Sequence, residues 1–162
     1  MTVIRRAGQD DVSALVELRA CMFEGMGVAH GTADAPWRTA AAEWFTDVLA
    51  QPRVFAAFVA DDAVHGVVSM AAGICHRLAP GPNSPSGVAG HVFNVATLPM
   101  HRRQGLSRLC MSALLEWFDR DTDAARIELN ASSTGATLYR SLGFVDHEYP
   151  AMRRPGRRAP AR

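Results

Sequence analysis

Two hydrophobic patterns define the middle of the chain. Residues 92–97 are rich in β-branched and aromatic side chains and end before Pro99, which is typical of a strand. From Leu106 onward the apolar residues recur at the spacing of one helical face. They are Leu106, Leu109, Cys110, Ala113, Leu114, Trp117 and Phe118. The pattern predicts a strand, a short polar loop and a helix that runs to about residue 121.

The same criteria predict the remaining elements. We expect a strand at 3–7, a helix from the acidic cap at 9–11 to the glycines at 25–27, and a helix over 40–49. Further strands are expected at 53–60, 65–74 and 126–132, then a short helix before Gly143 and a last hairpin through Val145 and Met152. The order β-α-α-β-β-β-α-β-α-β, with or without one more strand, predicts an α/β (α+β) fold with helices on both faces of a mixed sheet.

Length and charge limit the classes of protein. A chain of 162 residues that is 48% hydrophobic suits one domain, which we place at 1–152. The net charge of +1 argues against a nucleic-acid-binding protein. Residues 153–162 are rich in Arg and Pro, and we expect a disordered tail there.

Cysteine and histidine usage gives no sign of a metal site. The three cysteines lack metal-ligand spacing, and the six histidines show no HxxxH-like pair. An N-terminal signal sequence and an apolar run of about eighteen residues are both missing from the sequence. We therefore expect a cytoplasmic protein with reduced thiols and no membrane association.

The loop between the central strand and helix has the chemistry of an anion site. The first turn of a helix leaves N–H groups unpaired and carries partial positive charge. Gly105 can take a positive φ and offers no side chain to block a ligand, while Arg102 and Arg103 add full charge. A nucleotide P-loop is excluded because the chain has no lysine, and a G-x-G-x-x-G dinucleotide loop is excluded because only Gly105 is present.

Two motifs resemble the GNAT family of acetyl-CoA-dependent N-acetyltransferases. Residues 102–107 (RRQGLS) resemble the family's pyrophosphate loop, R/Q-x-x-G-x-G/A, with Ser107 as a small departure. Residues 138–144 (LYRSLGF) resemble its second hallmark, a short helix followed by a Gly-Phe turn. The resemblance covers roughly the C-terminal half of the chain and implies the GNAT fold, in which the central sheet is mostly antiparallel.

The resemblance also implies acetyl-CoA as cofactor. The pantetheine arm would pair with the strand before the loop, where a bulge would free a backbone amide near Asn94 or Val95 to polarise the thioester carbonyl. Ser132 would bind the cofactor or, as an equal alternative, cap the next helix. The cofactor-binding residues implied are Asn94, Val95, Ala96, Thr97, Arg102, Arg103, Gln104, Gly105, Leu106, Ser107, Asn130, Ser132 and Tyr139.

Acyl transfer to an amine also needs a general acid and a neutral amine. By its place in the second motif, Tyr139 is implied as the acid that protonates the leaving thiolate. His91 and Glu24 are candidates for the base, and Asp34, Glu128 or a chain of waters are alternatives.

These features predict an N-acetyltransferase that acts on the primary amine of a small or amino-acid-like molecule by direct attack in a ternary complex. Two alternatives stay open: a peptide or protein N-acetyltransferase and a non-catalytic acyl-CoA-binding module. A third class, a basic RNA-binding domain that uses Arg102 and Arg103, is disfavoured by the charge balance, so we expect no nucleic-acid partner. Segments 24–37 and 79–90 would set the acceptor. Relatives often form homodimers, and the sequence leaves the oligomeric state open.

Overall fold

A computed structural model describes residues 1–156. They form one sheet in which the strands follow chain order, β1-β2-β3-β4-β5. The strands are β1 (Thr2–Arg6), β2 (Phe55–Asp62), β3 (Gly66–Arg77), β4 (Val88–Thr97) and β5 (Ile127–Leu129). The helices are α1 (Val12–Gly25), α2 (Pro36–Leu49), α3 (Leu106–Asp121) and α4 (Ala136–Ser141), with 3-10 turns η1 (Gln9–Asp11) and η2 (Pro99–His101).

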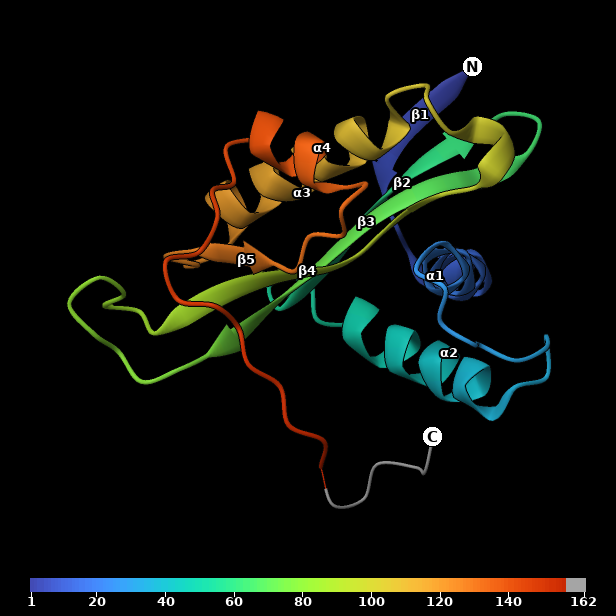
Figure 1. The fold of residues 1–162 in the computed structure, drawn as a ribbon. Helices are drawn as coiled ribbons and strands as arrows, with labels where there is room; N and C mark the ends of the chain where they lie inside the picture. Colours follow the sequence, from blue (N-terminus) through green and yellow to red (C-terminus); the bar gives the residue numbers. More distant parts are fainter. Residues whose placement is uncertain (157–162) are drawn as a thin grey trace.

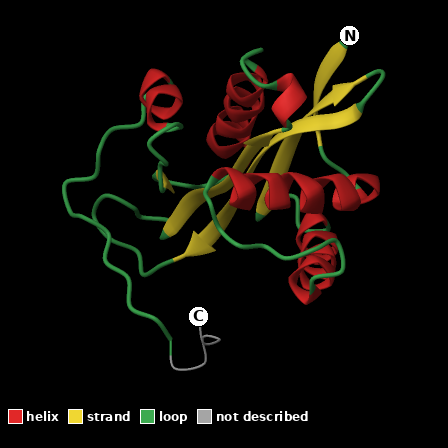
Figure 2. Cartoon of the chain, turned by 45° about the vertical axis from the view of Figure 1, so that its right-hand side comes forward, coloured by secondary structure: helices red, strands yellow, loops and turns green. Residues whose placement is uncertain are grey.

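The sheet is mixed and mostly antiparallel, as predicted. Strands β1 to β4 pair antiparallel with their neighbours, and only β4 and β5 run parallel. Helices α1 and α2 lie on one face and α3 and α4 on the other (Figures 1 and 2). Each face has its own hydrophobic cluster, one built on Leu15, Leu18 and Phe45, the other on Leu114 and Trp117. No helix within residues 1–156 combines the length and apolar character needed to cross a bilayer.

Helix α3 has the predicted bounds, but the buried stripe is rotated from the predicted one. Leu109 is half exposed, whereas Met111, which was not predicted to face the core, is fully buried. Leu106, Cys110, Leu114 and Phe118 are buried as expected. The buried stripe follows these positions, which are four residues apart except for the Cys110–Met111 pair, and Leu109 lies at its border with solvent.

The ring of Phe118 packs against two glycines of the sheet. A Cβ atom at Gly73 of β3 would lie 2.7 Å from the ring, and one at Gly90 of β4 would lie 2.5 Å from it. Both distances are shorter than a carbon–carbon contact allows. The two glycines therefore let α3 approach the sheet closely, in the region where β4 changes register.

Strand β4 carries a bulge at Phe93. Asn94 pairs with Ala72 and Val92 pairs with Gly73, so Phe93 is one extra residue on β4. Ladder pairing with β5 ends at Val92, beyond which the two strands separate. The bulge also turns Phe93 and Asn94 toward the same face, because Phe93 packs on the α1–α2 cluster and Asn94 contacts α1. The bulge expected near Asn94 is confirmed.

The predicted C-terminal hairpin is wrong. Strand β5 spans Ile127–Leu129 rather than 126–132, and no strand follows α4 within the described residues. Val145 is 88% exposed and Met152 is 96% exposed, so neither has an apolar partner to order a strand. Residues 153–156 are exposed and have no regular structure, and the rest of the predicted tail, 157–162, lies outside the described residues.

A buried carboxylate anchors the first turn of the chain. Asp11 accepts hydrogen bonds from Arg5 Nη1 and Nη2 and from the Gly8 N–H, each at 2.8 Å. The Arg5 guanidinium holds the pKa of Asp11 below its usual range. Since the folded-state pKa is depressed, this stabilisation is present above the unfolded pKa of about 4 and lost as pH falls through the folded value.

Asp11→Asn should therefore lower the free energy of unfolding at neutral pH by about 1–3 kcal/mol, and by much less near pH 3. Urea denaturation at the two pH values measures this. The exposed neighbour Asp10, whose side chain makes no hydrogen bond within residues 1–156, gives the control Asp10→Asn. Equal losses for Asp11→Asn at both pH values would show that the carboxylate charge is not the cause.

Candidate functional site

The loop before α3 has the backbone of an anion cradle. Gly105 has a φ of 78°, and Arg103 has a φ of 64°, the only positive value at a non-glycine residue described. A Cβ at Gly105 would meet nothing within 4 Å, so the space beside it is open. The Leu109 N–H donates to the Gly105 carbonyl at 3.1 Å, which begins the helical ladder. The N–H groups before it are the ones that an anion can accept from.

The two loop arginines have different roles. Arg102 is turned back, with Nε donating to the Thr97 carbonyl at 3.1 Å and Nη2 to Cys21 Sγ at 3.6 Å. It therefore fixes the loop against β4 and α1. Arg103 and Gln104 are exposed and make no side-chain hydrogen bond to the described residues. Arg103 is thus the guanidinium that is available to an anion.

Ser107, at the position that departs from the motif, belongs to a chain of hydroxyl groups. Its Oγ lies 2.8 Å from Thr97 Oγ1, which lies 2.7 Å from Ser69 Oγ. Ser69 in turn donates to the Ala96 carbonyl at 3.0 Å. The chain joins α3, β4 and β3, so a serine here stiffens the junction instead of only leaving room.

The side chains of β4 before the loop point to opposite faces. Val95 packs with the α3 cluster, and Ala96 packs with the α1–α2 cluster. Asn94 is fully buried, and its Oδ1 accepts a hydrogen bond of 2.9 Å from Arg19 of α1. Asn94 was predicted to contact the cofactor. Because its side chain is buried, only its backbone is free to bind a ligand beside the strand.

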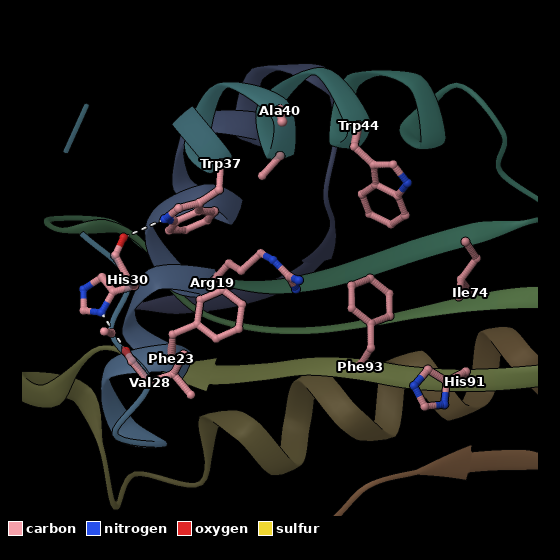
Figure 3. A pocket seen from close by; sticks show the side chains of 12 residues that line it. Arg19, Phe23, Val28, His30, Trp37, Ala40, Trp44, Ile74, His91 and Phe93 are labelled. Carbon is pink, nitrogen blue, oxygen red and sulfur yellow. Dashed lines mark hydrogen bonds between the residues drawn. The ribbon is translucent and has the colours of Figure 1, made fainter. Parts of the chain in front are cut away.

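A cavity of about 650 Å³ opens on the α1–α2 side of this strand. Figure 3 shows Arg19 extending between the rings of Phe23 and Phe93, with Trp37 and Trp44 above it. The guanidinium carbon lies 4.9 Å from the centre of the Phe23 ring and 5.9 Å from that of Phe93. Burial lowers the pKa of Arg19, but an arginine remains charged at neutral pH. The sequence reasoning missed Arg19, although its place between Leu18 and Met22 on the apolar helix face was a signal.

Among the candidate bases, His91 alone lines this cavity. Glu24 and Asp34 are exposed and do not line it. Glu128, on the outer strand β5, accepts a hydrogen bond of 2.9 Å from the Nε of Arg126. His30, at the other end of the cavity from His91, accepts the Trp37 indole N–H through its carbonyl at 2.6 Å (Figure 3).

Tyr139 lies in a second groove, of about 980 Å³, bordered by β5, α4 and residues 142–149. Its ring packs over Gly135, and burial raises the pKa of its hydroxyl above the usual value. The hydroxyl makes no hydrogen bond to the described residues. Tyr139 packs on the same cluster as Leu106 and Val95, which flank the cradle. The structure does not bring Tyr139 and His91 together in one cavity.

Asn130 and Ser132, between β5 and α4, lie in different surroundings. Asn130 is exposed and borders the groove of Tyr139. Ser132 Oγ accepts from the Gly135 N–H at 3.2 Å and lies 3.2 Å from Thr134 Oγ1. Ser132 therefore closes the turn before α4, but it does not cap the helix, because the N-cap of α4 is Gly135 and no side chain caps it. Within residues 1–156 no group of three or more His, Cys, Asp or Glu side chains is placed to hold a metal ion.

Comparison with known proteins gives a family match and structural neighbours. A family model described as an acetyltransferase (GNAT) domain matches residues 35–157. No curated protein matches the chain.

Solved structures share the fold over nearly the whole chain. A predicted acetyltransferase of Clostridium acetobutylicum, solved with acetyl-CoA, has 22% identity and a TM-score of 0.81, covering 94% of this chain and 96% of its own. A GCN5-related N-acetyltransferase of Ralstonia eutropha JMP134 has 22% identity and a TM-score of 0.75, covering 96% and 100%. Glucosamine-6-phosphate N-acetyltransferase of Arabidopsis thaliana has 13% identity and a TM-score of 0.72, covering 95% and 98%.

Proposed function

Because this chain belongs to the GNAT family of acetyltransferases, we propose that it transfers the acetyl group of acetyl-CoA to the primary amine of a small or amino-acid-like acceptor. The amine would attack directly in a ternary complex. The observation that carries this proposal is the open loop at Gly105, where positive φ angles and unpaired amides meet the N-terminus of a sixteen-residue helix. The free thiols of Cys21, Cys75 and Cys110 favour a reducing, cytoplasmic setting.

The residues present fit a pyrophosphate group. Arg103 is exposed and unpaired within the described residues, the amides before Leu109 have no helical partner, and no side chain fills the space beside Gly105. Bound acetyl-CoA would supply the activated thioester. Arg102 would hold the loop in shape through Thr97 and Cys21 rather than contact the phosphates.

Strand β4 would orient the acyl group. Beyond Val92 it loses β5 as a neighbour, so the backbone N–H groups on that side of the bulge can serve a ligand. His91 would take a proton from the ammonium group of the acceptor. It is the candidate base that lines the aromatic cavity, the one that Phe23, Trp37, Trp44 and Phe93 surround. The Tyr139 hydroxyl, free of protein hydrogen bonds among the described residues, would return a proton to the leaving thiolate.

Thermal unfolding with and without acetyl-CoA tests the cradle. A ligand at 100 times its dissociation constant stabilises a protein by about 2.7 kcal/mol, which for a chain of this size raises Tm by about 5–10 °C. We expect this shift for the wild type and its loss in Gly105→Glu, because a carboxylate at the open position repels phosphate.

Gly105→Ala is the matched control for this test. It imposes the same unfavourable φ of 78° without the negative charge, so it should lower Tm of the free protein yet keep most of the shift. No shift of the wild type at millimolar acetyl-CoA would contradict the proposed function. Steeply salt-dependent RNA binding would then point to the alternative use of the arginines.

A further inference from the structure

The aromatic cavity beside β4 holds a cation without an anion. Arg19 is the one permanently charged side chain that lines it, and no Asp or Glu does so. Arg19 forms no ion pair within residues 1–156, whereas Arg5, Arg38, Arg120, Arg126 and Arg140 all do. A charge withdrawn from water needs a partner of opposite sign, so the cavity lacks an anionic group.

Most N–H groups of the Arg19 guanidinium, which lines this cavity, also lack acceptors. Arg19 gives one hydrogen bond, from Nη1 to Asn94 Oδ1 at 2.9 Å, and its other N–H groups donate to no protein atom described. Asn94 is fully buried and does not line the cavity, so its side chain holds the guanidinium in place and is not itself a ligand contact. An oxyanion in the cavity would accept from the free edge of the guanidinium in bidentate fashion.

The rings around Arg19 fix its position and leave an apolar wall. Phe23 and Phe93 hold the guanidinium between them, so little side-chain entropy remains to be lost on binding. Trp37 packs edge-on against Phe23 at 5.6 Å, and Trp44 against Phe93 at 5.7 Å. The cavity therefore combines a rigid cation with aromatic surface, which suits a ligand that has both a carboxylate and a large apolar group.

We infer that the acceptor is an α-amino acid with a large apolar or aromatic side chain, whose carboxylate binds Arg19. This inference rests on the proposed acetyl transfer. Arg19 contacts Asn94 in the bulged segment of β4, so an amine one carbon away from the carboxylate stays beside the strand proposed to hold the thioester. An acceptor with several ammonium groups would be repelled by Arg19.

The proposed step balances without any other reactant. The neutral α-amine attacks the thioester carbonyl, an N–C bond forms and the C–S bond breaks. The amine loses a proton to the base, and the thiolate gains one. The products are an N-acetylamino acid and CoA.

Turnover with two matched amines tests the inference. L-phenylalanine and 2-phenylethylamine differ only in the carboxylate, and release of the CoA thiol reports acetylation of either. For the wild type we expect kcat/KM to be about 10- to 100-fold higher with phenylalanine, the value of one charged hydrogen-bonded pair. Arg19→Met should remove this preference by raising KM for phenylalanine, while 2-phenylethylamine is acetylated as before. Arg53→Met, at an exposed arginine outside the cavity, should change neither.

A binding measurement separates this inference from the proposed function. 3-Phenylpropanoate, which has no amine, should quench the fluorescence of Trp37 and Trp44 when it binds in the cavity. The dissociation constant obtained from this titration should be about 10- to 100-fold higher for Arg19→Met than for the wild type. If acetyl-CoA stabilises the protein but Arg19→Met affects both amines equally, or 3-phenylpropanoate binds both proteins alike, the inference fails and the proposed function stands. If acetyl-CoA gives no thermal shift and neither amine is acetylated, both fail.

Discussion

Tyr139→Phe should lower the turnover number by about 10- to 1000-fold and change acetyl-CoA affinity little. The substitution removes only the hydroxyl, which has no hydrogen bond to the described residues, so the packing of the ring over Gly135 is kept. A loss confined to kcat is the signature of a group that acts in the transition state. Steady-state kinetics with acetyl-CoA varied at fixed acceptor measures it.

The pH dependence of turnover is a second test of Tyr139. Burial raises the pKa of the Tyr139 hydroxyl above the ordinary value of about 10, so the acid keeps its proton throughout the neutral range. Loss of this proton should therefore produce the alkaline limb of the pH–rate profile, and that limb should be missing in Tyr139→Phe. Tyr149, the other tyrosine of the chain, is 70% exposed, and Tyr149→Phe should leave turnover unchanged. Unchanged turnover in Tyr139→Phe would remove the residue from the mechanism.

Phe118→Ala should lower the free energy of unfolding by about 3–5 kcal/mol. The ring is 1% exposed and fills the space above Gly73 and Gly90, where no Cβ exists to close the cavity after truncation. Urea denaturation measures the loss, and Phe118→Leu should cost less because part of the space stays filled. A loss below about 1 kcal/mol for Phe118→Ala would show that the sheet collapses onto the empty site.

A double-mutant cycle checks that the glycines and the ring act together. Gly73→Ala alone should destabilise by about 1–3 kcal/mol, because the added methyl group would lie 2.7 Å from Phe118. In the Phe118→Ala background the same change should cost much less, since the clash is gone. Additive losses would contradict the close packing of α3 on β3 and β4.

The strand–loop–helix around Gly105 could be predicted because its signals are local. A β-branched run, Pro99 and apolar residues at helical spacing are all read from near neighbours in sequence, and α3 (Leu106–Asp121) has the predicted bounds. The exposure of Leu109 could not be predicted in this way, because it depends on how α3 is rotated against the sheet, and contacts distant in sequence decide that. The predicted C-terminal hairpin through Val145 and Met152 is wrong for a related reason: a segment forms a stable strand only where a partner covers its apolar side chains, and both of these are exposed.

By itself, the sequence determined the elements up to α4, their order and the anion chemistry of residues 102–107, since these follow from backbone preferences and side-chain charge over a few residues. Only the tertiary structure decided which side chains contact one another and which cavity each one lines. It placed Arg19 on Asn94, 75 positions away, set that guanidinium against the rings of Phe23 and Phe93, and put Tyr139 and His91 in separate cavities. Such contacts depend on how helices pack across a sheet and on a single bulge at Phe93, which no local pattern specifies.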